Sequence, residues 1–200
     1  MKKIIIIMLF FNTSLVFGNK LKSDDITSKN SLQKVYFAGG CFWCMEETFD
    51  KFDGVISSVS GYSGGDLKNP TYEDVIYKDT GHVETIEITY DPKKISYIKL
   101  LDIFWQNIDP FDKYGQFCDK GKSYRSVVFF QNKDQEKIIK NSIKEIEKRF
   151  DTKVVTLLWK FDKFYQAETY HQDYYQRNFL HYLAYKKACQ REEVLNKIWN

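Results

Sequence analysis

Residues 34–52 read KVYFAGGCFWCMEETFDKF. The run at 34–38 is rich in β-forming residues and ends at two glycines. After the glycines, apolar side chains recur at helical spacing, namely Phe42, Met45, Phe49 and Phe52. This pattern predicts a strand, a glycine turn and then a helix over 42–52, and it places Cys41 where the helix begins.

Downstream of this unit, strand and helix patterns alternate. A short strand is predicted at 55–59, followed by the glycine-rich turn 61–65, and Thr71 opens a short helix. Residues 82–90 alternate in polarity, which predicts a strand, and Glu84 falls on its more apolar face. That face also carries Ile86, Ile88 and Tyr90.

The second half of the chain repeats the alternation. Ser96 caps a helix with an apolar stripe that ends before Pro110, and residues 124–130 form a strand. An amphipathic helix over 134–150 and a strand over 154–159 follow.

Two β-α-β units therefore follow one another with short connections. They predict an α+β fold, a two-layer sandwich of helices on a mixed sheet built from ferredoxin-like β-α-β units. Residues 166–199 are aromatic and charged, which predicts an aromatic-rich C-terminal extension that is helical or wrapped around the body.

Composition limits the class of protein. The chain has 200 residues, of which 43% are hydrophobic, 17% aromatic and 28% charged, so it is not disordered. With only 10 Gly and 3 Pro it is neither collagen-like nor dominated by linkers. The net charge of +3 indicates no basic surface for nucleic acid.

The N-terminus predicts export. Two lysines, a short apolar run and a small residue at Gly18 are typical of a secretory signal peptide over 1–18. An uncleaved signal anchor is the alternative, but the apolar run is shorter than the ~20 residues of a membrane span. Residues 19–32 are predicted to be a disordered lead-in, and residues 33–200 a single catalytic domain. We expect an exported, periplasmic protein without stable membrane insertion after cleavage.

The cysteines point to the chemistry. Cys41 and Cys44 lie one helical turn apart, and the helix N-terminus is expected to lower the pKa of Cys41, so the pair suits a nucleophile and a resolving thiol. Three alternatives stay open, namely half of a zinc site, a structural disulfide and two buried core thiols. A zinc site lacks a second cysteine pair, because Cys118 and Cys189 stand alone. We therefore predict no metal and no cofactor.

Further motifs sharpen this assignment. The motifs follow in the order Gly39-Gly40-Cys41-Phe42-Trp43-Cys44, Ser60-Gly61-Tyr62-Ser63-Gly64-Gly65, Asn69-Pro70-Thr71-Tyr72, Thr80-Gly81-His82-Val83-Glu84, Tyr90-Asp91-Pro92, Phe104-Trp105, Asn107 with Asp109-Pro110, Asp119-Lys120-Gly121 and Tyr124-Arg125-Ser126. In their order and spacing they resemble the peptide methionine sulfoxide reductases of the A type, over roughly residues 34–180.

The resemblance implies a reaction and roles for residues. Cys41 attacks the sulfoxide sulfur and becomes a sulfenic acid, and Glu84 donates a proton to the leaving oxygen. The family's site phenols correspond to Tyr72 and Tyr124, and its site carboxylate to Asp119. The implied substrate is free or protein-bound methionine sulfoxide of the S epimer, and the implied reductant is thioredoxin-like.

The remaining assignments follow from the chemistry and from departures from the family. Phe42 and Trp43 form an apolar wall for the methyl group on sulfur. Cys44 is the resolving thiol, because many members have glycine there and recycle through a cysteine-bearing, glycine-rich C-terminus that this chain lacks. Cys189 is expected to be packed and inert, with a second resolving role as the alternative. Cys118 is either a bystander or a competitor for the sulfenic acid.

Two other functions compete with this one. The first is a general thiol–disulfide oxidoreductase that uses Cys41 and Cys44 without Glu84. The second is a noncatalytic secreted binding module held by a Cys41–Cys44 disulfide. His82 and His171 lie near the matched motifs and are expected to be structural hydrogen-bonding residues.

Overall fold

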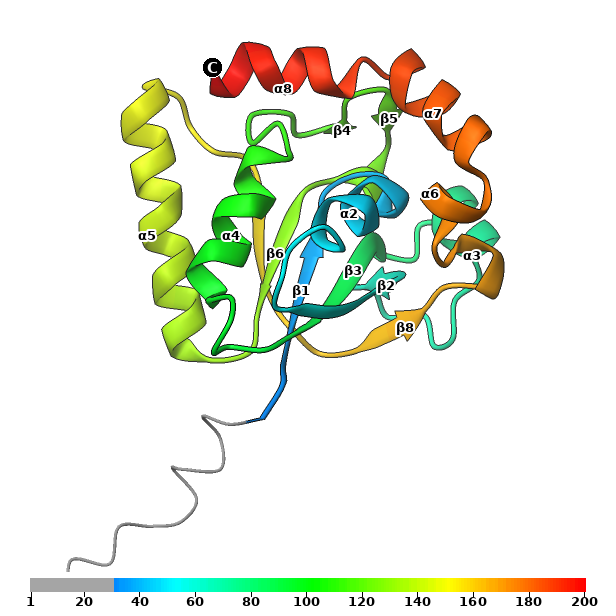
Figure 1. Ribbon diagram of the computed structural model, residues 1–200, viewed down its shortest axis with the longest axis horizontal. Coiled ribbons are helices and arrows are strands. Elements are labelled where there is room, and N and C mark those ends of the chain that lie inside the picture. The colour runs from blue at the N-terminus through cyan, green and yellow to red at the C-terminus, as the bar shows by residue number, and fades with distance from the viewer. Residues whose placement is uncertain (1–30) are drawn as a thin grey trace, which may run out of the picture.

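The computed structural model describes residues 31–200 (Figure 1). The predicted signal peptide 1–18 and most of the lead-in 19–32 therefore lie outside the described residues. Between residues 31 and 200, no helix combines the length and apolar character needed to cross a bilayer.

A six-stranded mixed sheet forms the centre of the molecule, in the order β7-β6-β1-β3-β2-β8. Only β6 and β7 pair in parallel, and the other neighbours are antiparallel. The bounds of these strands are β1 Gln33–Ala38, β2 Val55–Ser63, β3 Val83–Tyr90, β6 Val127–Phe130, β7 Leu157–Lys160 and β8 Phe164–Gln166. A separate two-stranded ribbon consists of β4 Gly115–Gln116 and β5 Asp119–Lys120.

Helices connect the strands and complete the chain. Within the body they are α2 Phe42–Phe49, α3 Tyr72–Tyr77, α4 Tyr97–Gln106, α5 Lys133–Phe150 and the 3-10 turn η1 Lys122–Tyr124. The C-terminal tail, which we define as residues 167–200, contains η2 Thr169–His171, α6 Tyr174–Arg177, α7 Phe179–Ala188 and α8 Arg191–Trp199. Figure 1 shows this tail passing beside and over the end of the sheet where α2 begins.

The inner part of the sheet has ferredoxin-like topology. Helix α2 connects β1 to β2, α4 lies between β3 and β6 in the chain, and the four strands stand in the order β6-β1-β3-β2. The predicted α+β fold with ferredoxin-like units and a helical C-terminal extension is confirmed. The later strands β7 and β8 extend the sheet at its two edges. The strand predicted over 154–159 is β7, which begins at Leu157, whereas the sequence pattern does not predict β8.

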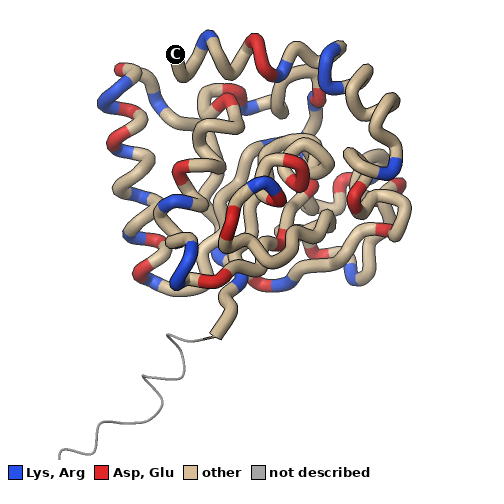
Figure 2. Tube along the Cα trace, in the orientation of Figure 1, with Lys and Arg blue, Asp and Glu red and all other residues tan. Residues whose placement is uncertain are grey.

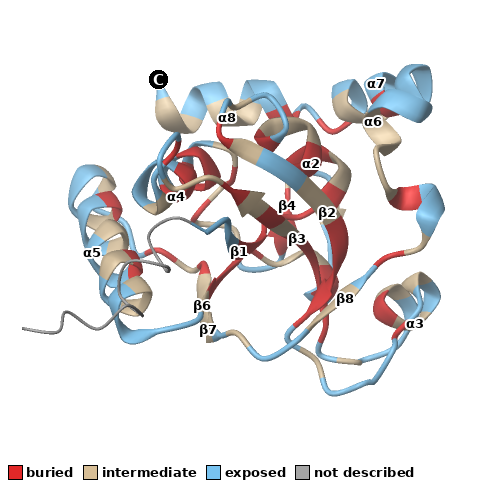
Figure 3. Ribbon diagram, turned by 60° about the horizontal axis from the view of Figure 1, so that its bottom comes forward, coloured by how far each residue is buried: buried red, intermediate tan, exposed pale blue. Residues whose placement is uncertain are grey.

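The two faces of the sheet are covered differently, as the alternation along β1 shows. Val35 and Phe37 join the main core with side chains of α2, α4 and α5. Tyr36 and Ala38 point to the other face, where a smaller cluster is covered by aromatic residues of 157–164 rather than by a helix. In Figure 3 the buried residues concentrate in the strands and α2, while the outer sides of α5 and α7 are exposed.

Several element boundaries differ from the prediction. The strand predicted at 55–59 continues to Ser63, because Gly61 lets β8 pair closely there, and a Cβ on Gly61 would lie 2.3 Å from the Phe164 ring. The strand predicted at 124–130 begins at Val127, because η1 occupies the preceding residues. The predicted caps hold, since Thr71 and Ser96 accept hydrogen bonds from the first turns of α3 and α4.

Charged residues of both signs are interspersed over the chain, as Figure 2 shows along α5. That helix carries acidic residues in its first turn and basic residues in its last turn, which suits its dipole.

A disulfide joins Cys118 to Cys189, with 4.9 Å between their Cα atoms. The expectation that these two cysteines stand alone, with Cys189 as an inert thiol, is therefore wrong. They are 71 residues apart in sequence, and only the return of the tail over the β4–β5 ribbon brings them together. The bond ties the loop that carries Asp119 to the junction of α7 and α8.

We expect Cys118→Ser to lower the free energy of unfolding by about 2–4 kcal/mol, because a disulfide that closes a long loop restricts the unfolded chain. Urea unfolding without reductant measures this change, and Cys189→Ser should match it. Under dithiothreitol the variants and the wild type should coincide. Equal stability of Cys118→Ser and the wild type in the absence of reductant would contradict the structural role of the bond.

Candidate active site

Cys41 is the residue that immediately precedes α2. The chain reaches it through Gly40, which has a φ of 77° and approaches Gln116 so closely that a Cβ would lie 2.5 Å from the Gln116 Cβ. Only glycine fits this turn without strain. The predicted strand, glycine turn and helix are thus confirmed, although the helix ends at Phe49 rather than Phe52.

A small cavity of about 70 Å³ lies beside Cys41. It is lined by Cys41, Phe42, Trp43, Tyr72, Glu84, Asp119, Tyr124 and Tyr185. Seven of these are residues that the sequence predicts for the site, and they come from α2, α3, β3, β5 and η1. The eighth predicted residue, Cys44, lies against Cys41 but lines a different hollow. Tyr185 is the lining residue that the sequence did not indicate.

Glu84 is the buried acid of this cavity. It is 3% exposed, and one carboxyl oxygen accepts a hydrogen bond from the backbone N–H of Phe42 at 3.0 Å. Burial raises the pKa of Glu84 well above its ordinary value, and this outweighs the opposing effect of the Phe42 N–H. Burial therefore favours the neutral carboxyl, which has a proton to give.

The two thiols form a coupled pair. Cys41 and Cys44 are both buried and free, and their side chains hydrogen-bond each other. Burial, reinforced by Cys44, raises the pKa of Cys41, so the expected lowering by the helix N-terminus is wrong for this state. The loss of water around the sulfur outweighs the dipole, which is worth at most about 2 kcal/mol.

Cys44 is the thiol with the lower pKa. The hydrogen bond from Cys41, together with the charge of Arg191 and a hydrogen bond from Tyr182, lowers its pKa to about 7 although burial opposes this. The pair therefore loses one proton near neutral pH, and the remaining proton lies between the two sulfurs. Its movement from Cys41 to Cys44 makes Cys41 the thiolate.

The phenols on the other side of the cavity are protonated donors. Tyr72 and Tyr124 hydrogen-bond each other, and burial raises the pKa of each. Asp119 accepts a hydrogen bond from the Tyr185 hydroxyl, while burial raises its pKa and Tyr185 and Arg191 act against this. An oxygen atom in the cavity would therefore meet hydrogen-bond donors, and a methyl group would meet the rings of Phe42 and Trp43.

The tail fixes the position of Trp43. Its indole N–H donates to Nδ1 of His171 at 3.2 Å, and its ring stacks on Tyr174 with 3.8 Å between centroids. Tyr185 contacts it edge-on. Burial lowers the pKa of His171 to about 4, so the imidazole is neutral and Nδ1 can accept. His171 and His82 are hydrogen-bonding residues as expected, since His82 accepts from the Gly65 N–H at 3.1 Å.

Arg191 anchors the tail to the backbone next to the site. It is 4% exposed and donates to the backbone carbonyl of Asn107 at 2.5 Å and to that of Gly39 at 3.5 Å. It therefore fixes both the glycine turn before Cys41 and the end of α4. The sequence offers one weak signal for such a role, namely the density of aromatic residues after residue 166, and none for Arg191 itself.

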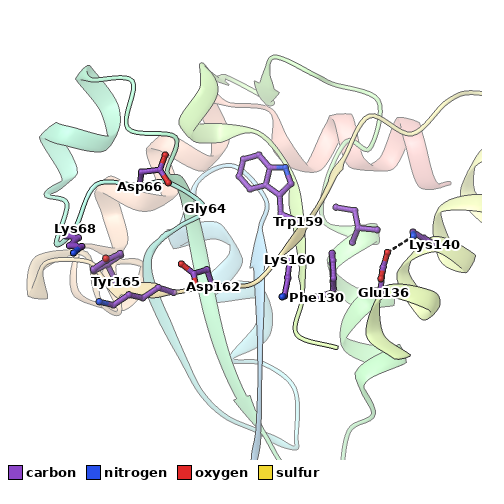
Figure 4. A pocket seen from close by; sticks show the side chains of 13 residues that line it. Gly64, Asp66, Lys68, Phe130, Glu136, Lys140, Trp159, Lys160, Asp162 and Tyr165 are labelled. Atoms are coloured by element: carbon purple, nitrogen blue, oxygen red, sulfur yellow. Dashed lines mark hydrogen bonds and ion pairs between the residues drawn. The ribbon is translucent and has the colours of Figure 1, made fainter. Parts of the chain in front are cut away.

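A wider hollow of about 750 Å³ lies elsewhere, between β7, β8 and α5 (Figure 4). Trp159 and Tyr165 line it together with charged side chains of both signs, and none of its lining residues is a cysteine. Although this hollow is larger than the cavity beside Cys41, the absence of a lining cysteine separates it from the thiol chemistry.

The thiol pair beside a neutral buried carboxyl defines a thiol-dependent oxidoreductase. A family model described as peptide methionine sulfoxide reductase matches residues 33–200. The chain belongs to this family, which confirms the resemblance seen in the motifs, and it is a peptide methionine sulfoxide reductase.

Individual relatives agree. The peptide methionine sulfoxide reductase MsrA of Listeria innocua is 45% identical over 174 residues, covering 86% of this chain and 98% of that protein. That of Ligilactobacillus salivarius is 48% identical over 166 residues, covering 82% and 96%. Among solved structures, reduced Mxr1 from Saccharomyces cerevisiae has a TM-score of 0.68 and 30% identity, covering 74% of this chain and 86% of that chain.

A second solved structure, methionine sulfoxide reductase A of Corynebacterium diphtheriae, has a TM-score of 0.67 and 26% identity, covering 74% of this chain and 75% of that chain. The fold and the family are therefore supported both by sequence and by structure.

We expect His171→Phe to raise KM for a methionine sulfoxide peptide about fivefold with little change in kcat, because Trp43 loses an acceptor worth about 1 kcal/mol. His171→Asn is the matched control, since its Oδ1 can replace Nδ1. In a Trp43→Phe background, His171→Phe should add nothing. Equal losses in the Asn and Phe variants would show that His171 does not act through Trp43.

Proposed function

We propose that Cys41 attacks the sulfur of methionine (S)-sulfoxide in oxidised proteins and peptides, and in the free amino acid, while Glu84 protonates the departing oxygen. The observation that carries this is the shared cavity, in which Cys41 and the neutral carboxyl of Glu84 face the same space of about 70 Å³. The hydrogen bond from the Phe42 N–H holds Glu84 at the start of the helix that presents Cys41. Nucleophile and acid are thereby fixed relative to each other.

The walls of the cavity orient the sulfoxide. Phe42 and Trp43 receive the methyl group, and Tyr72 and Tyr124 donate hydrogen bonds to the oxygen on the side of Glu84. Asp119 lies at the remaining side, held by Tyr185. Three chemically different walls distinguish the two configurations at sulfur, which accounts for selection of a single epimer, and family membership implies that this is the S epimer.

The first chemical step transfers oxygen to the enzyme. The Cys41 thiolate bonds to the sulfoxide sulfur while Glu84 gives its proton to the oxygen. The protonated oxygen then passes to the Cys41 sulfur as the S–O bond to methionine and the new S–S bond break, and the products are methionine and a Cys41 sulfenic acid. Cys44 then attacks the sulfenic sulfur, and the oxygen leaves as water while a Cys41–Cys44 disulfide forms. An external dithiol supplies the two electrons that restore both thiols.

Contact between the two sulfurs supports Cys44 as the resolving thiol. Because the residues are one helical turn apart, the disulfide can form with little backbone movement. Cys118 and Cys189 are joined to each other, so neither has a free thiol with which to compete for the sulfenic acid.

We further propose that the protein is exported to the periplasm and is reduced there by an exported thioredoxin-like protein. Two observations support export, namely the signal-like residues 1–18 and the Cys118–Cys189 bond, since disulfides persist in oxidising compartments. An external reductant is required because the chain supplies no free cysteine, among its described residues, beyond the catalytic pair.

We expect the wild type to convert only the S epimer of a methionine sulfoxide peptide, and Cys41→Ala to form no methionine. Chromatography of each epimer with dithiothreitol as reductant measures this. Cys44→Ser should form one methionine per enzyme yet lose turnover with a thioredoxin-type donor. Full activity of Cys41→Ala would overturn the mechanism.

We expect Glu84→Gln to slow methionine formation in a single turnover by about 10²–10⁴-fold, because the amide keeps the acceptor for the Phe42 N–H but has no acidic proton. In the wild type the rate should fall as pH rises through the raised pKa of Glu84, and the variant should lack this fall. Glu87→Gln, on the same strand and outside the cavity, is the control. An unchanged rate in Glu84→Gln would instead favour a general thiol–disulfide oxidoreductase.

A further inference from the structure

The two thiols of the catalytic pair open to different spaces. Cys41 lines the cavity of about 70 Å³ described above, whereas Cys44 lines a separate hollow of about 300 Å³. The hollow is formed by α2, the end of α4, α7 and α8, and the two spaces share no lining residue. The thiol pair therefore lines two separate spaces.

The cavity beside Cys41 and the hollow beside Cys44 differ in volume, so they can admit groups of different size. A water molecule takes up about 30 Å³ of liquid, so the first cavity has room for a methyl sulfoxide group but not for the cysteine loop of another protein. The hollow beside Cys44 is about four times larger, and exposed residues such as Gln106 and Asn196 lie on its rim. A protruding cysteine fits only the second space.

The charged side chains that line the hollow favour binding of an anionic group. Lys51, Lys186 and Arg191 line it, against the carboxylates of Glu47 and Glu192. Glu47 is already held by ion pairs with Lys51 at 2.9 Å and Lys186 at 2.7 Å. With three cationic and two anionic side chains the hollow has a net charge of +1, which favours the approach of a thiolate toward Cys44.

We propose that the regenerating dithiol enters the hollow between α2, α4 and α8 and attacks the Sγ of Cys44, through a space separate from the cavity that takes the methionine sulfoxide. This inference rests on the Cys41–Cys44 disulfide of the proposed function. The incoming thiolate bonds to Cys44 and the Cys41–Cys44 bond breaks, which releases Cys41 as a thiolate in its cavity. The second thiol of the reductant then attacks the reductant sulfur that is bonded to Cys44. This forms the reductant's own disulfide and releases Cys44.

Access decides which sulfur is attacked. In the reduced enzyme Cys44 has the lower pKa, which by itself would make Cys44 the better leaving group and direct attack to Cys41. That order rests first on the hydrogen bond that Cys41 gives to Cys44, and this bond does not exist in the disulfide. Cys41 lines the small cavity and not the larger hollow, so the larger hollow directs attack to Cys44.

A trapped intermediate tests the choice of sulfur. Oxidised enzyme is mixed with a thioredoxin whose second active-site cysteine is replaced by serine, and the mixed disulfide is located by peptide mapping without reductant. The expected linkage is at Cys44, with Cys41 free to react with an alkylating reagent. A linkage at Cys41, or at Cys118 or Cys189, overturns the proposal.

A variant that fills the hollow tests the route. Asn196→Trp should slow reduction of the Cys41–Cys44 disulfide by intact thioredoxin about tenfold. It should leave the first methionine formed by reduced enzyme unchanged in rate. Lys197→Trp, the neighbouring exposed position of α8 outside the hollow, is the control and should change neither half-reaction.

The two half-reactions separate this inference from the proposed function. Normal methionine formation with unchanged disulfide reduction in Asn196→Trp overturns the route alone. Failure of reduced wild-type enzyme to form one methionine and a Cys41–Cys44 disulfide overturns the proposed function and the route with it.

Discussion

The hydrogen bond from the Phe42 N–H to Glu84 is the contact on which the site depends. It joins the first turn of α2 to the middle strand β3, two elements that the ferredoxin-like topology places side by side. A backbone N–H that a helix start leaves without an intrahelical partner thus holds a buried carboxyl. The same geometry sets the Cys41 thiol beside a buried acid, and burial favours the neutral form of that acid.

The C-terminal tail fixes the positions of site residues that lie on the strands, on α2 and in the connecting loops. Tyr185 holds Asp119, His171 and Tyr174 hold Trp43, and Arg191 holds the turn before Cys41. These contacts cross long sequence distances, and the Cys118–Cys189 bond adds a covalent link to them. The sheet and α2 thus provide the reacting groups, whereas the tail determines how firmly they are placed.

Local patterns in the sequence predicted the strand, turn and helix around Cys41 and the buried face of Glu84, because periodicity reports which side of an element meets the core. They did not predict Tyr185, Arg191 or the pairing of Cys118 with Cys189, since these depend on how the chain returns over itself. The pKa order of the thiols was also beyond reach, because burial of Cys41 and its bond to Cys44 are properties of the assembled core.

The position of the tail in the chain has a consequence for biosynthesis. A ribosome makes the thiol pair before the residues that cover it, so every nascent molecule passes through a stage in which Cys41 and Cys44 exist without their cover. During that stage the thiols are open to any oxidant or stray partner thiol. Packing of Tyr182 and Tyr185 of α7 against the pair ends that stage, and a molecule interrupted before it would carry reactive sulfur without a selective site.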